Sequence, residues 1–321
     1  MSEIDVLCIG DLDVDMFISV PSIPGFDQKV GGRNHGQKPG GMAANAAVAI
    51  SRFGLRSRLI SAVGDDPAGV FAVAEIGREG VDLDFLSRRN GVNTFMCVVL
   101  ISPSGEKSLI RLETDAYLPS VADLQDAAFS GVRHVHMTYG SSELSLEALK
   151  LAASAGLSTS LDLEPPDIAR NPLGLGEVLS YVDTLFLNSE ALELATRLLG
   201  QSFGVRMLRE AGEMIVTMGA KGCRRITAED TVDMPGFAVA SVDTTGAGDC
   251  FAGSYLASRL SGASPSRCLE FANAAAALAT LDYGAQAAMP RRPGVEDFLE
   301  LRRHEMPSGP RAPHGVLHAG T

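Results

Sequence analysis

Strand-like and helix-like segments alternate along the second part of the chain, from about residue 120 onward. Such alternation is typical of a parallel sheet with helices on its faces. The segments expected are 132–137, 144–155, 157–163, 184–187, 190–199 and 213–218. Near the N-terminus, an apolar run at residues 5–10 that ends in glycine predicts another buried strand. We therefore expect an α/β fold.

Two segments of the first part show a different pattern. Residues 16–30 alternate apolar and polar side chains and are interrupted by Pro21 and Pro24. This pattern favours edge strands of a small sheet over a central strand. Residues 94–101, a turn at 102–106 and residues 107–112 give the strand, turn and strand of a hairpin.

A glycine-rich turn joins a predicted strand, residues 237–242, to a helix predicted from apolar spacing at residues 251–260. The turn reads Asp243-Thr244-Thr245-Gly246-Ala247-Gly248-Asp249. With small side chains at Gly246, Ala247 and Gly248, an anion can approach the backbone N–H groups at the positive end of the helix dipole. The turn is therefore a candidate phosphate site.

The aspartate at the start of this helix, Asp249, has two interpretations. An aspartate in this position is commonly an N-cap that accepts a hydrogen bond from the first turn. Beside an anion site it can instead be a general base, which takes a proton from an alcohol while phosphate charge is stabilised. The residues alone leave both open.

Three carboxylates, Asp11, Asp13 and Asp15, follow the first predicted strand at alternating positions. On an extended segment they would project from one face. One interpretation is a solvated acidic loop or a divalent-metal site. The other is recognition of a neutral sugar, because carboxylates accept hydrogen bonds from hydroxyl groups.

Composition narrows the class of protein. The 321 residues are 45% hydrophobic and 21% charged, enough for one large α/β domain with an insertion. A net charge of -12 argues against a nucleic-acid groove. Five cysteines without CxxC spacing suit reduced thiols. The chain has no basic leader and no apolar run long enough to span a membrane, so we expect a cytoplasmic protein without membrane partners.

Two strings resemble the signatures of the ribokinase-like (PfkB) carbohydrate kinases. DTTGAGD, at 243–249, resembles the C-terminal signature, and GGMAANAA, at 40–47, resembles Gly-Gly-x-x-x-Asn-x-Ala. The resemblance covers roughly residues 4–300. It implies a three-layer α/β/α domain with a central, mostly parallel sheet over residues 1–304. It also implies a small β lid from about 16–38 and 94–112. Residues 305–321, rich in Pro, Gly and His, are expected to be a flexible tail.

The resemblance also implies a reaction and the residues for it. The family transfers the γ-phosphate of ATP to a sugar alcohol, with Asp249 as base and Mg²⁺ bridging the phosphates. Residues 246–248 would then form the anion hole. Acceptor contacts would come from Asp13, Asp15, Gly40, Gly41 and Asn45. Nucleotide contacts would come from Asn188, Thr217, Gly219, Gly222 and Asn273.

Two metal sites follow from the resemblance, and the chain departs from the family pattern at both. The Asn-x-x-Glu motif begins at Asn188 but has Ala191 in place of Glu, so Glu190 is the candidate for the magnesium shell. A potassium site beside the anion hole would use Asp243, Thr245 and Gly284. A serine that often completes this site is replaced by Ala288. Modest activation by potassium is expected.

The sequence says less about the identity of the acceptor than about the reaction. Met42 and Gly140 stand where ribokinases usually have Lys and Glu, which disfavours ribose. A phosphorylated acceptor would require that Lys29, Arg33, Lys38 and Arg111 converge. A neutral sugar is the main expectation and a nucleoside the alternative. A non-catalytic sugar or nucleotide sensor is disfavoured, because Asp249 and the whole anion hole are present. Many members of the family dimerise through the lid, so a homodimer is expected.

Overall fold

A computed structural model describes residues 4–103, 106–200, 203–210 and 212–305. Its larger sheet has eight strands in the order β14-β13-β12-β11-β10-β9-β1-β4. Neighbouring strands from β12 to β4 are parallel, whereas β13 and β14 are antiparallel at one edge. The strands are β1 Ile4–Ile9, β4 Ser57–Ile60, β9 Val132–Thr138, β10 Ser158–Leu163, β11 Thr184–Asn188, β12 Glu213–Thr217, β13 Cys223–Ile226 and β14 Thr231–Met234.

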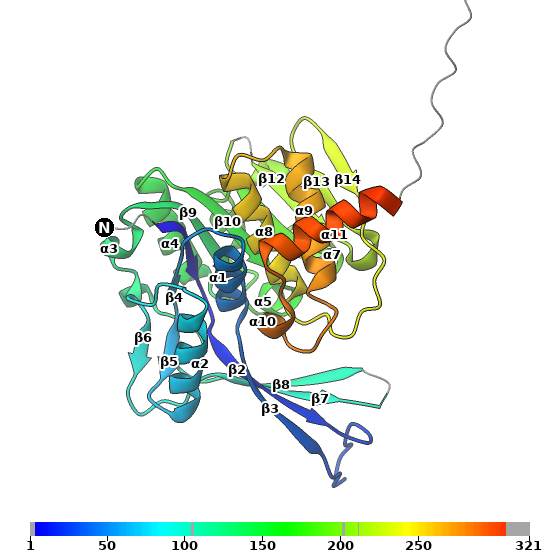
Figure 1. The fold of residues 1–321 in the computed structure, drawn as a ribbon. Coiled ribbons are helices and arrows are strands. Elements are labelled where there is room, and N and C mark those ends of the chain that lie inside the picture. Colours follow the sequence, from blue (N-terminus) through cyan, green and yellow to red (C-terminus); the bar gives the residue numbers. More distant parts are fainter. Residues whose placement is uncertain (1–3, 104–105, 201–202, 211, 306–321) are drawn as a thin grey trace, which may run out of the picture.

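Helices cover both faces of this sheet (Figure 1). One face carries α1 Met42–Arg52, α8 Ala247–Leu260, α9 Pro265–Leu278 and α11 Arg292–Glu305. The other carries α3 Asp126–Phe129, α4 Ser142–Ser154, α5 Pro165–Arg170, α6 Leu175–Leu179 and α7 Ser189–Leu199. The predicted α/β fold, three layers around a mostly parallel sheet, is therefore confirmed. Among the described residues, no helix is both long and apolar enough to cross a membrane.

The packing of the first strand explains why its sequence is apolar from Val6 to Ile9. Side chains alternate between the two faces of a strand. Leu7 and Ile9 belong to the apolar core under α4, and Val6 and Cys8 to the core under α1. Helices cover both faces from Val6 to Ile9, and only Asp5, near the start of β1, is partly exposed. The strand ends at Ile9 in the interior of the molecule, just before the acidic segment that begins at Asp11.

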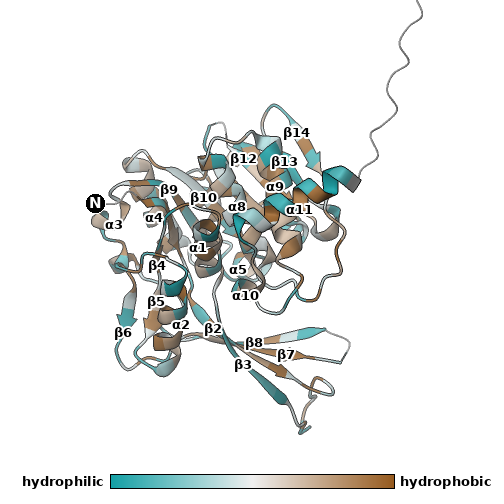
Figure 2. Ribbon diagram, viewed as in Figure 1, coloured by the Kyte–Doolittle hydropathy of each residue, from teal (hydrophilic) through white to brown (hydrophobic). Residues whose placement is uncertain are grey.

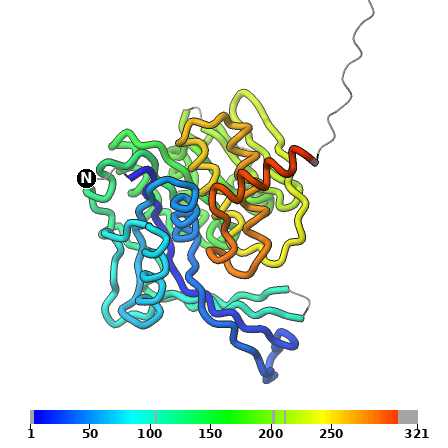
Figure 3. Tube along the Cα trace, viewed as in Figure 1, coloured from blue at the N-terminus to red at the C-terminus, as the bar shows by residue number. Residues whose placement is uncertain are grey.

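A second sheet of four strands, in the order β3-β2-β7-β8, stands apart from the main domain as the predicted lid. The strands are β2 Asp13–Ser19, β3 Arg33–Gly40, β7 Met96–Ile101 and β8 Lys107–Leu112. Figure 3 shows the blue and cyan parts of the chain side by side there. In Figure 2, β7 is largely hydrophobic and β3 hydrophilic. Smaller elements are β5 Ala62–Gly64, β6 Ser87–Arg89, α2 Pro67–Arg78 and α10 Ala285–Ala288.

The prediction of edge strands at residues 16–30 is wrong. β2 lies inside the lid sheet, between β3 and β7, and the edges are β3 and β8. Pro21 and Pro24 fall beyond the end of β2 at Ser19, so neither removes a donor from the strand pairing. Both prolines lie in the loop that connects β2 to β3.

Residues 237–242 are not a strand. After β14 the chain leaves the sheet as an extended loop, and the N–H groups of Val242 and Asp243 both donate to the Thr280 carbonyl, at 2.7 and 3.1 Å. A short apolar run predicts burial but not a neighbouring strand to pair with. Phe237 of this run packs against Phe298 of α11 instead, with ring centroids 5.3 Å apart. Two further expectations, at the 104–105 turn and in the tail from 306, lie outside the described residues.

Candidate active site

The glycine turn before α8 leaves backbone N–H groups open to an anion. Gly246 is the N-cap, with φ of 75°, and a Cβ there would lie 2.4 Å from that of Ala285. Ala247 and Gly248 follow in the first helical turn, where no helical carbonyl lies four residues earlier to accept a hydrogen bond from the N–H groups. Ala247 N–H donates to the Thr244 carbonyl at 3.2 Å, which closes the turn. A Cβ added to Gly248 would meet nothing within 4 Å, so open space adjoins the helix end.

Asp249 does not cap the helix. It is the third helical residue rather than the first, and it is buried. Its Oδ2 accepts a hydrogen bond from Asn45 Nδ2 at 2.8 Å. Burial raises the pKa of Asp249 well above its ordinary value, and the hydrogen bond from Asn45 works against that rise. The N-cap interpretation is thus excluded, and the carboxylate is placed as a proton acceptor would be.

Asn45, expected to bind a sugar hydroxyl, contacts the carboxylate of Asp249 instead. Its Oδ1 accepts a hydrogen bond from Gln286 Nε2 at 2.9 Å, so a chain of side chains runs from Gln286 through Asn45 to Asp249. One amide hydrogen of Asn45 holds the carboxylate, and the second can still reach an acceptor. Gln286 was not predicted, because its partner is 241 residues away in the sequence.

The acidic segment after β1 divides into two parts. Asp11 supports the fold: its Oδ1 accepts from Ala43 N at 3.1 Å and so holds the start of α1. Asp13 and Asp15 are also buried but face the interior of the lid, beside Cys97. Burial, reinforced by the neighbouring carboxylates, raises the pKa of Asp15 to about 7 and that of Asp13 well above its ordinary value.

Asp13 carries the clearest sign of a missing partner. Within the described chain, its Oδ1 is one of the few buried side-chain atoms without a hydrogen bond. A native buried oxygen of this kind calls for a ligand or water. Gly40 leaves the space, since a Cβ there would lie 2.2 Å from Asp13 Oδ1. Gly41, with φ of 94°, caps α1 beside Asp11. Asp13 and Gly40 therefore fit a hydroxyl donor.

Asp167 and Arg111 also lie at the acceptor end and were not predicted as a pair. Arg111 Nη1 is 3.7 Å from Asp167 Oδ1, and its guanidinium lies 4.8 Å from the ring of Tyr117. Burial raises the pKa of Asp167 to about 6, although the charge of Arg111 opposes the rise. Asp167 follows Pro165-Pro166 at the start of α5. Because proline and aspartate are common in the first turn of a helix, the sequence gives no sign of a functional carboxylate there.

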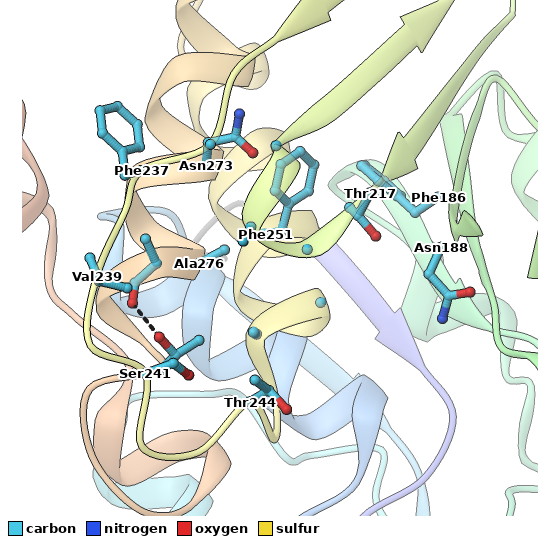
Figure 4. A pocket seen from close by; sticks show the side chains of 18 of the residues that line it. Phe186, Asn188, Thr217, Phe237, Val239, Ser241, Thr244, Phe251, Asn273 and Ala276 are labelled. Carbon is cyan, nitrogen blue, oxygen red and sulfur yellow. Dashed lines mark hydrogen bonds between the residues drawn. The ribbon is translucent and has the colours of Figure 1, made fainter. Parts of the chain in front are cut away.

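A cavity of about 610 Å³ lies on the other side of the anion turn, within the range of nucleotide pockets. Figure 4 shows its walls, with Phe186, Phe237 and Phe251 from separate elements. All five predicted nucleotide residues line it: Asn188, Thr217, Gly219, Gly222 and Asn273. The amide of Asn273 holds the loop carbonyls of Met234 and Pro235, each at 3.2 Å. An apolar wall of this size suits an adenine ring.

The phosphate end of the cavity is acidic. Asp162 and Glu164 line it together with Thr244 and Gly248. Burial, with nearby carboxylates, raises the pKa of Glu164 to about 7 and that of Asp162 well above its ordinary value. Glu190 is exposed and is not among the lining residues, though its charge contributes to the raised pKa of Glu164. Carboxylate oxygens are ligands that suit Mg²⁺, so Asp162 and Glu164 are candidates to hold it.

The residues assigned to potassium meet, but around an ammonium group. Asp243 Oδ1 accepts from Thr245 N and Oδ2 from Gly284 N, both at 2.8 Å. Lys107 Nζ, from the lid, pairs with Asp243 Oδ1 and lies 3.0 Å from Thr245 Oγ1. Burial alone would raise the pKa of Asp243, but these hydrogen bonds outweigh it and hold the pKa below its ordinary value.

The anion turn, the buried carboxylate and the pocket are the features of a sugar phosphotransferase, and sequence comparison agrees. Residues 3–292 match the family model described as pfkB family carbohydrate kinase. The chain therefore belongs to the pfkB family of carbohydrate kinases. It is an ATP-dependent sugar kinase, as the resemblance of its two signatures implied.

Individual relatives cover nearly the whole chain. An ATP-dependent ribose-1-phosphate kinase of Halopiger xanaduensis is 30% identical over 92% of this chain and 98% of its own length. A ribokinase of Haemophilus influenzae is 27% identical, over 91% and 97%. The crystal structure with ATP and Mg²⁺ of an E. coli protein assigned as ribokinase II has a TM-score of 0.81 and 25% identity. That match covers 93% of this chain and 99% of the other.

Proposed function

We propose that this enzyme transfers the γ-phosphate of ATP to a hydroxyl group of a neutral sugar, with Asp249 as the general base. The observation that carries the proposal is the position of Asp249. It adjoins Gly248 of the nucleotide cavity, and it accepts a hydrogen bond from Asn45 of α1. Helix α1 begins just after Gly40, which lies against Asp13. The carboxylate therefore lies between the acceptor aspartates and the phosphate end of the nucleotide cavity.

The residues of the chain have separate tasks in this proposal. Asp249 accepts the proton of the acceptor hydroxyl, while Asn45 and Gln286 hold the carboxylate in place. The N–H groups of residues 246–248 stabilise charge on the transferred group. Asp162 and Glu164, with Glu190 nearby, would hold Mg²⁺, which neutralises phosphate charge. Asp13 and Asp15 fix the sugar by accepting hydrogen bonds from its hydroxyls.

A neutral acceptor is favoured because, of the four basic side chains Lys29, Arg33, Lys38 and Arg111 in the lid, only Arg111 lies at the acceptor end. Arg111 lies against Asp167 and Glu113. Lys38 donates to the backbone carbonyl of Tyr283. Lys29 and Arg33 are exposed, toward the far end of the lid. Apart from Arg111, whose charge is shared with Asp167 and Glu113, the acceptor end holds buried carboxylates, which would repel a sugar phosphate.

An acceptor panel tests this proposal. ATP consumption is measured with pentoses, hexoses, their phosphates and nucleosides. We expect the highest kcat/KM with a neutral sugar. A preference for a sugar phosphate, as the name of the Halopiger relative describes for that protein, would contradict the neutral acceptor. A preference for nucleosides would support the alternative within the family. No turnover with any compound would favour a sensor.

We also propose a homodimer that forms through the lid. Strand register puts Met16, Val98 and Ile110 in one row, and Met96 and Leu112 in the next, on the same face of the lid sheet. Ile110 and Leu112 are 49% and 47% exposed, which is high for adjacent large apolar side chains. A second copy of the lid would cover this face. Light scattering at micromolar concentration should give twice the monomer mass, and a monomer mass would contradict it.

The cysteines bear on where the enzyme acts. All five are free and buried, so none is paired in a disulfide. Such use of cysteine is common in reducing compartments. This supports the cytoplasm as the place of action.

A further inference from the structure

The two edge strands of the lid each send a lysine onto the loops beside the anion turn. Lys107, on β8, pairs with Asp243 and lies 3.0 Å from the hydroxyl of Thr245. Lys38, on β3, donates to the carbonyl of Tyr283 in the loop after α9. Figures 1 and 3 show the two loops, before α8 and after α9, on the side of the main domain that faces the lid.

The lysine contacts take up oxygen atoms that a monovalent cation would need. The Asp243 carboxylate already accepts from the N–H groups of Thr245 and Gly284 in addition to Lys107. Its side chain has no exposed surface, and that of Lys107 only 16%. Lys38 also fills the space beside Gly284, since a Cβ there would lie 2.9 Å from Lys38 Nζ. A potassium ion at Asp243 would therefore face a fixed positive charge at close range, and the residues do not fit it.

We propose that the ammonium group of Lys107 takes the place of a monovalent cation at Asp243 and Thr245, so that this kinase works without potassium. An ammonium is a compact unit charge that suits the same oxygen ligands. Thr245 and Asp243 immediately precede Gly246, so the lysine steadies the turn whose N–H groups hold phosphate. Lys107 is thus a positioning residue. This proposal rests on the role of the turn in phosphoryl transfer proposed above.

Because Lys107 lies on the lid, its contacts depend on the position of the lid. Its two partners belong to the main domain, so the contact exists only when β8 lies against the loops. Lid closure and order in the anion turn are therefore coupled through one charge. A freely diffusing cation would give no such coupling.

The test compares salts and variants. For the unmodified enzyme we expect equal kcat in potassium, sodium and N-methylglucamine chlorides at matched ionic strength. Lys107→Ala should lower kcat about tenfold in N-methylglucamine, as for a lost hydrogen bond to a charged group. Potassium or ammonium ions should restore part of that loss. Lys107→Arg should remain insensitive to cations. Lys150→Ala, which removes a lysine on α4 paired with Glu147, is the control and should behave as the unmodified enzyme.

A second measurement does not need turnover. Potassium should raise the melting temperature of Lys107→Ala but not that of the unmodified enzyme or of Lys150→Ala, whichever acceptor the kinase uses. Severalfold activation of the unmodified enzyme by potassium would overturn the proposal, even if Lys107→Ala does not fold. A folded Lys107→Ala that keeps full kcat, or loses it without rescue by any cation, would overturn it too.

Discussion

At the scale of single residues, we propose that two buried carboxylates recognise the acceptor. Asp13 and Asp15 stand side by side at the start of β2, with the bare backbone of Gly40 against them. Keeping two such groups close together and out of water is unfavourable without a ligand. Hydroxyl donors of a sugar supply the hydrogen bonds that the described chain does not give to Asp13 Oδ1. The site is therefore held ready for a polyol at some cost in stability.

Asp15→Ala should weaken binding of the acceptor and spare that of ATP. A hydrogen bond to a charged group is worth about 1.5–3 kcal/mol, so the dissociation constant of the sugar should rise at least tenfold. Calorimetric titration with the sugar and with ATP measures both. Asp84→Ala, which removes an exposed carboxylate outside the site, is the control. Loss of ATP binding with sugar binding intact would show that the two sites have been exchanged.

At the scale of secondary structure, we propose that the N-terminus of α8 is where phosphate charge is stabilised. The turn needs glycine at positions 246 and 248 for different reasons. Gly246 needs a left-handed backbone and lies against Ala285. Gly248 has helical backbone and open space around it, so its missing side chain serves the ligand.

Alanine at each position should separate these reasons. Gly246→Ala should destabilise the protein by roughly 1–2 kcal/mol or more, because an L-residue resists this backbone and Ala285 is in the way. Gly248→Ala should be as stable as the unmodified protein, or more so by up to about 1 kcal/mol, as alanine favours the helix. Yet its kcat should fall, because a methyl group then occupies the approach to the N–H groups. Urea unfolding and kcat for both variants check this. A fully active Gly248→Ala would contradict the anion hole.

Elements with local signals could be predicted from the sequence, and contacts between distant segments could not. Helix α2, Pro67 to Arg78, carries such local signals, because Asp66 caps it and Pro67 fits its first position. Residues 237–242 look equally strand-like but have no strand beside them. Asp249 was found from its motif. The contact between Asp249 and Asn45 joins residues 204 positions apart. The contact between Lys107 and Asp243 joins residues 136 positions apart.

At the scale of the whole molecule, the interior holds an excess of acidic groups between the lid and the main domain. Burial raises the pKa of Asp15 and of Glu164 to about 7, while in an unfolded chain these groups titrate near pH 4. The folded protein thus binds more protons than the unfolded chain around neutral pH. Stability must then decrease as pH rises through this range. His134 and His136, whose pKa burial lowers to about 3 and about 4, are neutral in the folded protein. In the unfolded chain they are still about half protonated at pH 6.5, so they oppose this trend until about pH 7.5.

The ligand-free protein should therefore be more stable at pH 6.5 than at pH 8. Two carboxyls with folded pKa near 7 contribute about 1–2 kcal/mol, and His134 and His136 offset roughly half of it, so a net difference of about 1 kcal/mol, or a few degrees in melting temperature, is expected. Thermal unfolding at the two pH values, without Mg²⁺, measures it. Asp15→Asn cannot titrate and should show a smaller difference. A melting temperature that rises from pH 6.5 to pH 8 would show that the acids are not buried as described.

The most direct test of the proposed chemistry is the kinetics of Asp249→Asn. Asparagine keeps the shape of the side chain but cannot take a proton from the acceptor hydroxyl. We expect kcat to fall by about 10²–10⁴, the range for a lost general base, with ATP affinity and melting temperature little changed. A variant with near-normal kcat would show that Asp249 is not the base and that the proton leaves by another route.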